Sequence, residues 1–204
     1  MPTFWQSCYS DSMETILLAA GHSKRMGEGK LLLPFRGEPL LIHALRGALE
    51  GSSKVIVVTS KETGNLINPL KEEFGDRLLI VPNSHSEWGQ FYSTQLGIEH
   101  LSSEAPFFLA LGDLPLIRGE HYNLLRKELS NWEGVRPFYQ GNPGHPVLCA
   151  PHIATAIKEA PRNSTVHSLL EGREIYNYAS RDEAWVIDVD TPQAYADLIK
   201  NYGG

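Results

Sequence analysis

The 204-residue sequence is poor in cysteine, in long apolar runs and in basic charge. Its two cysteines, Cys8 and Cys149, are too few for a disulfide scaffold and too far apart for a C-x-x-C redox or zinc motif. No stretch of about 18 consecutive apolar residues occurs, so we expect no membrane-spanning helix. Lys and Arg total 18 against 24 Asp and Glu, and the net charge of -6 argues against a broad surface for nucleic acid or acidic membranes. A local basic cluster for a small anionic substrate is still compatible with this balance.

The first residues also lack the features of a secretory signal. The segment MPTFWQSCYSDSM has neither a basic start nor an apolar stretch. We therefore expect a cytoplasmic protein, with residues 1–13 as a flexible N-terminal extension and residues 14–204 as one domain. Apolar residues make up 42% of the chain and charged residues 21%, which is typical of a globular protein that buries its own core.

Short apolar, β-branched runs alternate with helical patterns up to residue 116, which indicates a parallel α/β sheet. In this part, strands are expected at residues 15–20, 54–59, 77–81 and 106–111, and helices at 39–50 and 89–101, with a weaker helix interrupted by Pro69. Later, helices are expected at 122–129, 153–159 and 166–170, and strands at 134–139, 145–150, 174–179 and 185–189. Thr191 and Pro192 have the pattern of an N-cap and first helical residue for a last helix, which reaches about Asn201.

A glycine-rich stretch follows the first expected strand. The segment LLAAGHSKRMGEGK holds three glycines and several polar or basic residues, namely Gly21, Ser23, Lys24, Arg25, Gly27, Gly29 and Lys30. Glycines let several main-chain amides approach one anion, Arg25 can grip phosphate oxygens with its planar fork, and Lys30 adds a mobile point charge. This combination predicts a phosphate-binding loop; the alternative is a surface loop whose basic residues are only solvated.

The spacing in this loop excludes two well-known phosphate motifs. A Walker loop requires Ser or Thr after its lysine, whereas Lys30 is followed by Leu31. The dinucleotide fingerprint requires a third glycine three positions after Gly29, where Leu32 stands. The loop therefore belongs to another class of phosphate site.

Polar residues also follow other expected strands. Thr59, Asn83 and Asp113 each come at a strand end, and Asp188 and Asp190 stand near the end of the last one. Ligands of open α/β sheets bind beyond the carboxyl ends of the strands. Magnesium is usually held by one or two carboxylates plus substrate phosphates, so these aspartates are candidate metal ligands. Taken singly, Asp113 and Asp190 could instead cap the turn and the helix that follow them.

Five segments resemble the signatures of the molybdenum-cofactor nucleotidyltransferases, in order and in spacing, from residue 16 to residue 198. They are LAAG-x-S-x-RMG-x-x-K with LLPFRGEPLL after it, NSHSEWGQFYSTQLGIEHL, LALGDLPLI at 109–117, GNPGHPVL at 141–148, and VIDVDTPQAYADL at 186–198. The cytidylyltransferase branch is the most similar, because Ala20 stands where guanylyltransferases usually carry a glycine. The resemblance implies an α/β fold, a Rossmann-like three-layer sandwich with a mostly parallel sheet and a small β extension on the acceptor side.

The resemblance also implies a reaction and its residues. A nucleoside monophosphate, CMP from CTP, would pass to molybdopterin with release of pyrophosphate, and an acceptor molybdoenzyme or its chaperone would be a partner. Arg25, Lys30 and Asp113 would be catalytic, and Mg²⁺ would be held by Asp113 with Asp190 or Asp188. Nucleotide binding is expected at Ala19, Ala20, Gly21, Ser23, Arg25, Met26, Gly27, Lys30, Thr59, Asn83 and Ser93. Acceptor binding is expected at Gly144, His145 and Pro146.

One segment departs from the pattern of this branch. At residues 160–178, APRNSTVHSLLEGREIYNY replaces a more acidic Gly-Asp-x-Gly stretch. The departure affects the acceptor more than the nucleotide. Transfer to a sugar phosphate or another phosphorylated alcohol is therefore an alternative, and so is a non-catalytic accessory protein that binds a nucleotide or the cofactor.

Overall fold

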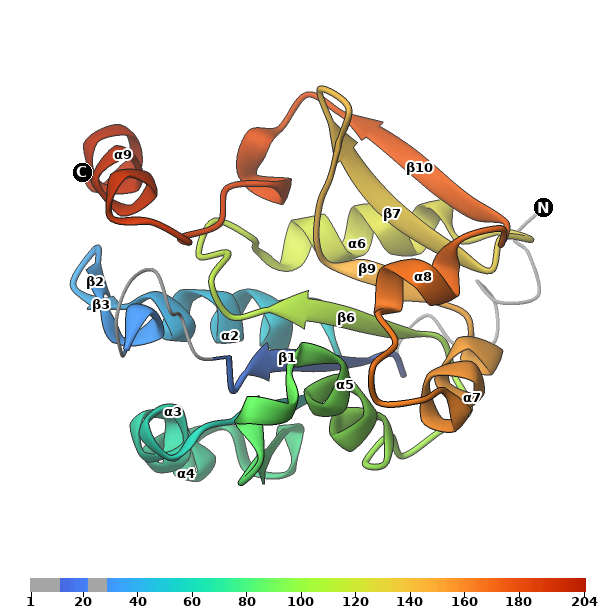
Figure 1. The fold of residues 1–204 in the computed structure, drawn as a ribbon. Coiled ribbons are helices and arrows are strands. Elements are labelled where there is room, and N and C mark those ends of the chain that lie inside the picture. The colour runs from blue at the N-terminus through green and yellow to red at the C-terminus, as the bar shows by residue number, and fades with distance from the viewer. Residues whose placement is uncertain (1–11, 22–28) are drawn as a thin grey trace.

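A computed structural model describes residues 12–21 and 29–204 as a sheet with helices on both sides (Figure 1). The strands are β1 (Glu14–Ala19), β2 (Pro34–Phe35), β3 (Glu38–Pro39), β4 (Lys54–Thr59), β5 (Leu78–Pro82), β6 (Phe107–Leu111), β7 (Gly134–Tyr139), β8 (Asn142–Pro143), β9 (Val147–Cys149) and β10 (Ile175–Ser180). The α-helices are α2 (Leu40–Gly51), α3 (Lys61–Ile67), α4 (Lys71–Phe74), α5 (Gln90–Ile98), α6 (Gly119–Glu128), α7 (Pro151–Glu159), α8 (Val166–Leu170) and α9 (Pro192–Tyr202). The 3-10 turns are η1 (Lys30–Leu32), η2 (Asn68–Leu70), η3 (Gly75–Arg77), η4 (Ser86–Trp88) and η5 (Glu183–Trp185).

The sheet has a parallel half and a mixed half. Its order is β10-β7-β9-β6-β1-β4-β5, with β8 paired to β7. β6, β1, β4 and β5 run parallel, so their carboxyl ends meet at one edge. β9 is antiparallel to both β6 and β7, and β10 runs parallel to β7. This arrangement confirms the expected class of a mostly parallel sheet with a small β extension.

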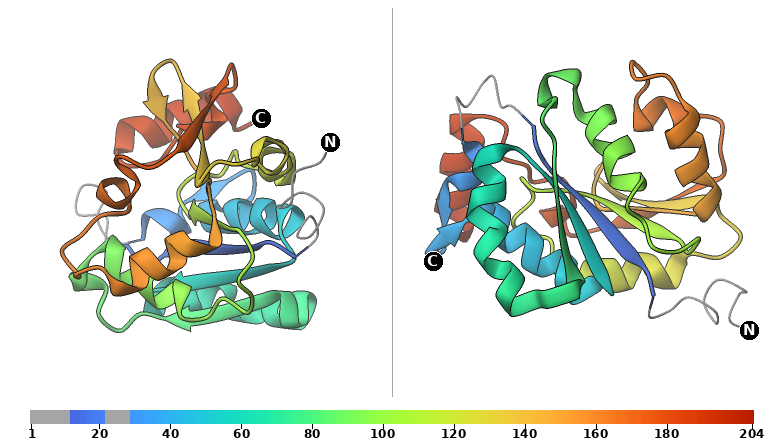
Figure 2. Two further views of the ribbon diagram at one scale, coloured as in Figure 1. Left: turned by 90° about the vertical axis from the view of Figure 1, so that its right-hand side faces the viewer. Right: turned by 90° about the horizontal axis from the view of Figure 1, so that it is seen from below.

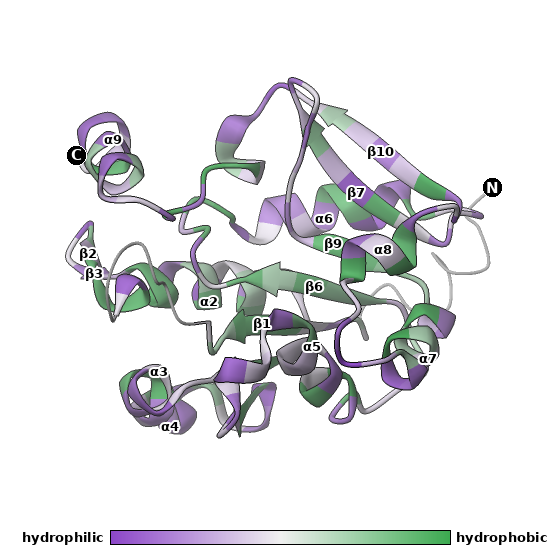
Figure 3. Cartoon of the chain, viewed as in Figure 1, coloured by the Kyte–Doolittle hydropathy of each residue, from purple (hydrophilic) through white to green (hydrophobic). Residues whose placement is uncertain are grey.

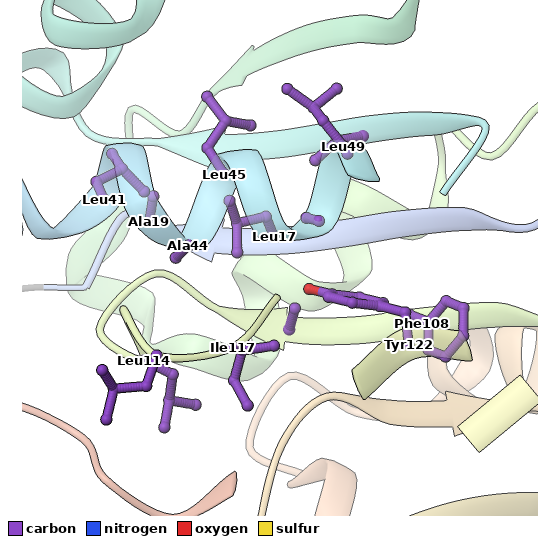
Figure 4. Close-up of a cluster of buried hydrophobic side chains, with 14 of the residues drawn as sticks. Leu17, Ala19, Leu41, Ala44, Leu45, Leu49, Phe108, Leu114, Ile117 and Tyr122 are labelled. Carbon is purple, nitrogen blue, oxygen red and sulfur yellow. The ribbon is translucent and has the colours of Figure 1, made fainter. Parts of the chain in front are cut away.

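Alternation along the central strands divides the core between the two faces of the sheet. In β1, Leu17 and Ala19 belong to one buried cluster and Ile16 to the other. The first cluster packs under α2 and α6 and is drawn in Figure 4, where Leu41 and Leu45 lie over β1. The second cluster packs under α5, α7 and α8. The turned views of Figure 2 show helices on both sides of the sheet, the layered arrangement of a three-layer sandwich.

The strands in the two halves of the sheet differ in composition and in burial. β1 and β6 are apolar through most of their length, whereas β10 alternates in polarity (Figure 3). β1 and β6 are buried because helices cover both of their faces, while β10 forms an edge of the sheet and has no fully buried residue. Within the part of the chain that the structure describes, no helix has the length and apolar character needed to cross a membrane.

One expected strand is wrong. Residues 185–189 form no strand: Trp185 ends the turn η5, and the Asp188 amide hydrogen-bonds to the Val186 carbonyl two residues back. The apolar side chains are buried for another reason, because Trp185 packs edge-on against His121 of α6 with ring centres 4.6 Å apart. The local apolar pattern thus indicated correctly that these side chains are buried, but it did not indicate whether the segment pairs with a strand.

Met13 belongs to the folded domain although the expected extension includes it. Its side chain is 1% exposed, and its carbonyl accepts hydrogen bonds from the amide and hydroxyl of Ser53. Residues 1–11, the rest of that extension apart from Ser12, lie outside the described residues.

Candidate active site

Lys30 joins the loop after β1 to two of the predicted carboxylates. Its Nζ lies 2.5 Å from Asp113 Oδ2 and 2.6 Å from Asp190 Oδ1. Lys30 and Asp113 are nearly buried, with side chains 12% and 15% exposed, while Asp190 is 51% exposed. Burial lowers the pKa of Lys30, but attraction to Asp113 and hydrogen bonds to both carboxylates outweigh it and raise the pKa above its ordinary value. The ammonium is therefore charged at neutral pH.

Asp113 is held rigidly by the main chain around it. The amide of Gly112, at the end of β6, donates to the carbonyl of Leu18 in β1. A Cβ on Gly112 would lie 2.9 Å from the Leu41 side chain in α2 and 3.2 Å from the Leu18 carbonyl, so a larger residue would require both neighbours to shift. The Asp113 carbonyl also accepts a hydrogen bond from the Val189 amide at 3.3 Å. These contacts direct the Asp113 carboxylate to the edge where the parallel strands end.

Asp188 and Asp190 reach that edge from a segment that is far away in sequence and is not a strand. The bond between Val189 and Asp113 brings the two segments together, and Figure 1 shows the chain before α9 passing beside the loop after β6. Burial together with the nearby charges of Asp113 and Asp190 raises the pKa of Asp188. Among the described residues, three carboxylates thus lie near one lysine, which leaves an excess of negative charge in this part of the structure.

A cleft of about 910 Å³ opens over these groups. Of the predicted nucleotide-binding residues, Ala20, Gly21, Lys30 and Ser93 line it, and so do Asp113, Asp188 and Asp190. The remaining lining residues are Leu18, Leu31, Ser86, Glu87, Gly89, Gln90 and Leu111. The cleft therefore collects residues from the ends of β1 and β6, from the start of α5 and from the segment before α9.

Three predicted nucleotide-binding residues, Ala19, Thr59 and Asn83, do not line the cleft and lie behind the residues that do. Thr59 is fully buried beside Gly64 of α3. The Ala19 carbonyl accepts a hydrogen bond from the Thr63 hydroxyl. The Asn83 side chain donates to Ser93 Oγ at 3.0 Å and accepts from the His85 amide at 2.8 Å. Asn83 thus supports the turn that leads into α5, and its role in reading a base stays a prediction.

A second cavity of about 530 Å³ adjoins the cleft and shares Leu18, Gly89, Gln90 and Leu111 with it. The predicted acceptor residues Gly144 and His145 line this cavity, which we call the acceptor-side pocket. Pro146 instead borders a small void beside it, also lined by His145. Trp88, Arg136 and Arg162 also line the acceptor-side pocket, together with residues 163–167.

The main chain of the GHP segment is fixed against Trp185. The His145 amide donates to the Trp185 carbonyl, and a Cβ on Gly144 would come within 2.4 Å of that oxygen. The His145–Pro146 bond is cis. Burial lowers the pKa of His145, so its imidazole is neutral at pH 7. A neutral imidazole can donate and accept hydrogen bonds at the pocket wall.

Four predicted nucleotide-binding residues, Ser23, Arg25, Met26 and Gly27, lie outside the described residues. Conversely, the sequence prediction missed Gln90 and Arg136. Gln90 begins α5 just after the strand end that was singled out at Asn83, so its position along the chain was a usable signal. Arg136 lies inside a strand, where no local pattern distinguishes a pocket residue from a solvated one.

The carboxylates suit an ion that takes few protein ligands. Asp113 Oδ1 is buried and has no hydrogen-bond partner among the described residues, so it is a hard oxygen donor left available. At the same time, no group of three or more His, Cys, Asp or Glu in this part of the chain is arranged as a ready-made metal site. The donors thus fit an ion such as Mg²⁺, which completes its shell with water and substrate phosphates, and not an all-protein cage.

Comparison with known proteins agrees with this geometry. Residues 15–184 match the family described as the MobA-like NTP transferase domain. The molybdenum cofactor cytidylyltransferase of Escherichia coli (strain K12) is 28% identical over 196 residues, which cover 94% of this chain and 97% of that protein.

Solved structures share the fold. The crystal structure of Rv0371c from Mycobacterium tuberculosis H37Rv superposes with a TM-score of 0.78 at 21% identity, covering 93% of this chain and 99% of that one. The crystal structure of Rv0371C in complex with manganese gives a TM-score of 0.75 at 20% identity, with the same coverage. Because the family match covers most of the chain, including nearly the whole sheet, this chain is a nucleotidyltransferase that belongs to the MobA-like NTP transferase family.

Proposed function

We propose that the protein transfers CMP from CTP to molybdopterin bearing molybdenum and releases pyrophosphate. The observation that carries the proposal is the placement of Lys30 between Asp113 and Asp190, in a cleft that begins at Gly21. This arrangement combines a fixed cation, carboxylates for a divalent ion and an exposed glycine after β1. A triphosphate needs all three.

The chain's own groups would do most of the work. Phosphoryl-type transfer depends on positioning and on charge neutralisation more than on covalent help from the protein. Lys30 would stabilise charge on the α-phosphate and on the departing pyrophosphate, with Arg25 as a second cation. Mg²⁺, held by Asp113 with Asp190 or Asp188, would supply further charge neutralisation at the phosphates when bound. A fold neighbour was crystallised with manganese, and the excess negative charge around Lys30 favours a divalent cation.

The adjoining pocket would hold the acceptor. It meets the cleft at Gly89 and Gln90, so an acceptor there would face the α-phosphate of a nucleotide in the cleft. Attack by an acceptor phosphate oxygen on the α-phosphorus would form the new P–O–P bond and break the bond to pyrophosphate. The preference for CTP rests on Ala20 and on similarity to the Escherichia coli cytidylyltransferase.

The direct test measures pyrophosphate release with each of the four ribonucleoside triphosphates, with Mg²⁺, and with or without molybdenum-loaded molybdopterin. We expect release with CTP only when the acceptor is present, and loss of release after addition of EDTA. The Asp113→Ala variant should be inactive, whereas Asp76→Ala, a change at an exposed aspartate of η3, should keep full activity.

Other outcomes point to the alternatives. Release with a sugar phosphate or another phosphorylated alcohol, and none with molybdopterin, would replace the acceptor. Nucleotide binding with no release for any acceptor would indicate an accessory protein. Release with GTP in preference to CTP would refute the assignment of the base.

A further inference from the structure

Arg162 lies on an aromatic platform at the rim of the acceptor-side pocket. Its guanidinium carbon is 4.2 Å from the ring centre of Trp88 and 5.5 Å from that of Tyr92. The His85 ring stacks on Trp88 with centres 4.1 Å apart and planes 7° apart. Arg162 and His85 thus both contact the indole of Trp88, which is still 40% exposed. The platform consists of His85, Trp88 and Tyr92.

This arrangement assigns Trp88 a supporting role. Trp88 lines the pocket and is 40% exposed. Its indole holds the guanidinium of Arg162 by cation–π attraction. Because the platform limits the rotamers of Arg162, less conformational entropy is lost when the guanidinium binds a ligand.

Arg162 and Arg136 share one further property. Neither has a carboxylate within ion-pair distance among the described residues, although acidic residues outnumber basic ones in the chain. The Arg136 guanidinium hydrogen-bonds only to a neutral amide oxygen, Asn177 Oδ1, at 3.1 and 3.3 Å. Both arginines line the acceptor-side pocket, which also has apolar lining residues such as Leu109 and Val147. The positive charge there is not neutralised by the described part of the protein.

We infer that Arg162, held by Trp88 and Tyr92, and Arg136 are the specificity-determining residues of the acceptor-side pocket and select an acceptor with a phosphate group over its neutral analogue. The inference rests on the proposed function for the identity of the pocket. Guanidinium groups bind phosphate through two parallel hydrogen bonds, and the apolar part of the lining lowers the competition from water. Arg162 lies in the segment 160–178 that departs from the cytidylyltransferase pattern, so this residue would distinguish the chain within its family.

The first experiment measures binding, without any reaction. Isothermal titration with phenyl phosphate, and with phenol as its neutral counterpart, is carried out on the full chain and its variants. We expect Arg162→Gln to weaken binding of phenyl phosphate about tenfold or more, the effect of one lost charge-assisted hydrogen bond. Arg162→Lys should recover only part of the affinity, because an ammonium cannot bind in a fork. Phenol should bind equally weakly to all variants.

Further variants test the role of the platform and show in which cavity phenyl phosphate binds. Trp88→Leu should weaken binding less than Arg162→Gln, because it keeps the charge but removes the platform. Arg181→Gln, a matched change at an exposed arginine, should have no effect. Lys30→Gln should also leave the affinity for phenyl phosphate unchanged, since Lys30 lines the other cleft. Circular dichroism of each variant checks that it is folded.

Two results would overturn the inference. One is equal affinity of the original protein and Arg162→Gln for phenyl phosphate, including no measurable binding to either at millimolar concentration. The other is weaker binding in Lys30→Gln alone, which would place the probe in the nucleotide cleft.

A kinetic experiment separates this inference from the proposed reaction. With molybdopterin as acceptor, Arg162→Gln should raise the KM for the acceptor about tenfold, with little change in the KM for CTP or in kcat. If no triphosphate gives pyrophosphate but the loss of phenyl phosphate binding persists, the proposed function fails and the phosphate site stands. If pyrophosphate is released with unchanged acceptor KM in Arg162→Gln, the reaction stands and the inference fails.

Discussion

The cleft around Lys30 and the acceptor-side pocket share Gly89 and Gln90, but their described residues carry different charged groups. Among the described residues, the cleft has three aspartates near one lysine, whereas the pocket contains two arginines without a carboxylate partner. Under the proposed function, the first arrangement would bind a metal-bound polyphosphate and the second a bare anion. A reaction between two anions is slowed by their mutual repulsion, and separate neutralisation of each partner reduces that barrier.

The two regions are also held in place differently. Asp113 follows the buried strand β6, which apolar packing fixes on both faces, and Val189 hydrogen-bonds to Asp113 from the segment that carries Asp188 and Asp190. The pocket is lined partly by β7, β8 and β9 and by the loop at residues 162–165, and polar contacts of Glu133 with His152 and Arg173 support this part of the molecule. Under the proposed function, loop residues beside a more rigid centre would allow the acceptor to change without loss of the chemistry.

The most severe test of the cleft is Asp113→Asn, which keeps the size of the side chain and removes its charge. We expect kcat to fall on the order of a thousandfold, because the variant loses a buried carboxylate at the reacting phosphates. Pyrophosphate release over a range of Mg²⁺ concentrations checks this. The matched variant Asp76→Asn should behave as the original protein. Full activity of Asp113→Asn would remove this residue from the site.

Lys30→Ala should lower turnover about a hundredfold, the effect of one preorganised donor at the developing charge. Lys30→Arg should restore part of the rate, since it restores the charge but not the geometry. Lys158→Ala, on the exposed face of α7, is the control. Single-turnover rates measured with saturating nucleotide separate the chemical step from binding. A near-normal rate in Lys30→Ala would mean that the lysine serves only to hold Asp113 and Asp190.

Gly144→Ala tests the support of the pocket. The added Cβ would clash with the Trp185 carbonyl, and we expect a loss of about 2 kcal/mol in the free energy of unfolding as the segment shifts. Urea unfolding measures the loss, and the acceptor KM should rise more than the KM for CTP. Gly204→Ala adds a Cβ that meets nothing within 4 Å and should change neither. Equal effects on both KM values would show that the pocket and the cleft are not independent.

The smallest effect is expected at Glu133, on the outer side of the extension. Hydrogen bonds from the Glu174 amide, His152 and Arg173 lower the pKa of Glu133 to about 2. A carboxyl with a lowered pKa in the folded state stabilises the protein above its ordinary pKa of 4.5, and this contribution is lost as the pH falls towards 2. Glu133→Gln should therefore cost about 1 kcal/mol at pH 7 after screening by solvent, and less at lower pH.

Urea unfolding at several pH values between 7 and 3 checks this prediction, with Glu104→Gln as the matched change at an exposed glutamate. A difference between Glu133→Gln and the original protein that stays constant down to pH 3 would show that the loss does not come from the carboxylate charge.

Much of the parallel half could be predicted because its signals are local. Apolar β-branched runs predicted β4 at its observed bounds and β1, β5 and β6 to within one residue at each end. Thr191 caps α9 as expected, with its side chain accepting from the Ala194 amide. The segment before it shows the limit of such signals. Trp185 and Val189 in this segment are apolar and buried, but burial against a helix and burial in a sheet produce the same pattern.

The candidate site shows the same contrast between residues that local sequence signals identify and residues that only the fold brings together. Glycines, a lysine and aspartates at strand ends identified Gly21, Lys30 and Asp113 as one site, because the carboxyl ends of parallel strands meet at one edge. Arg136 was missed because a cation in the middle of a strand is usually solvated, and only the folded structure shows that it lines the pocket. Arg162 was noticed as a departure from a pattern, without a role.

The sequence by itself determined the class of fold, the strands of its parallel half and the chemical character of the cleft, since all three depend on residue types at fixed local spacing. Only the tertiary structure decided which carboxylates meet Lys30, that Arg162 lies over the Trp88 ring, and that two arginines without a described carboxylate partner share one pocket. The physical reason is that these properties depend on contacts between segments tens of residues apart. Such contacts are set by packing of the whole chain and leave no periodic trace in any single segment.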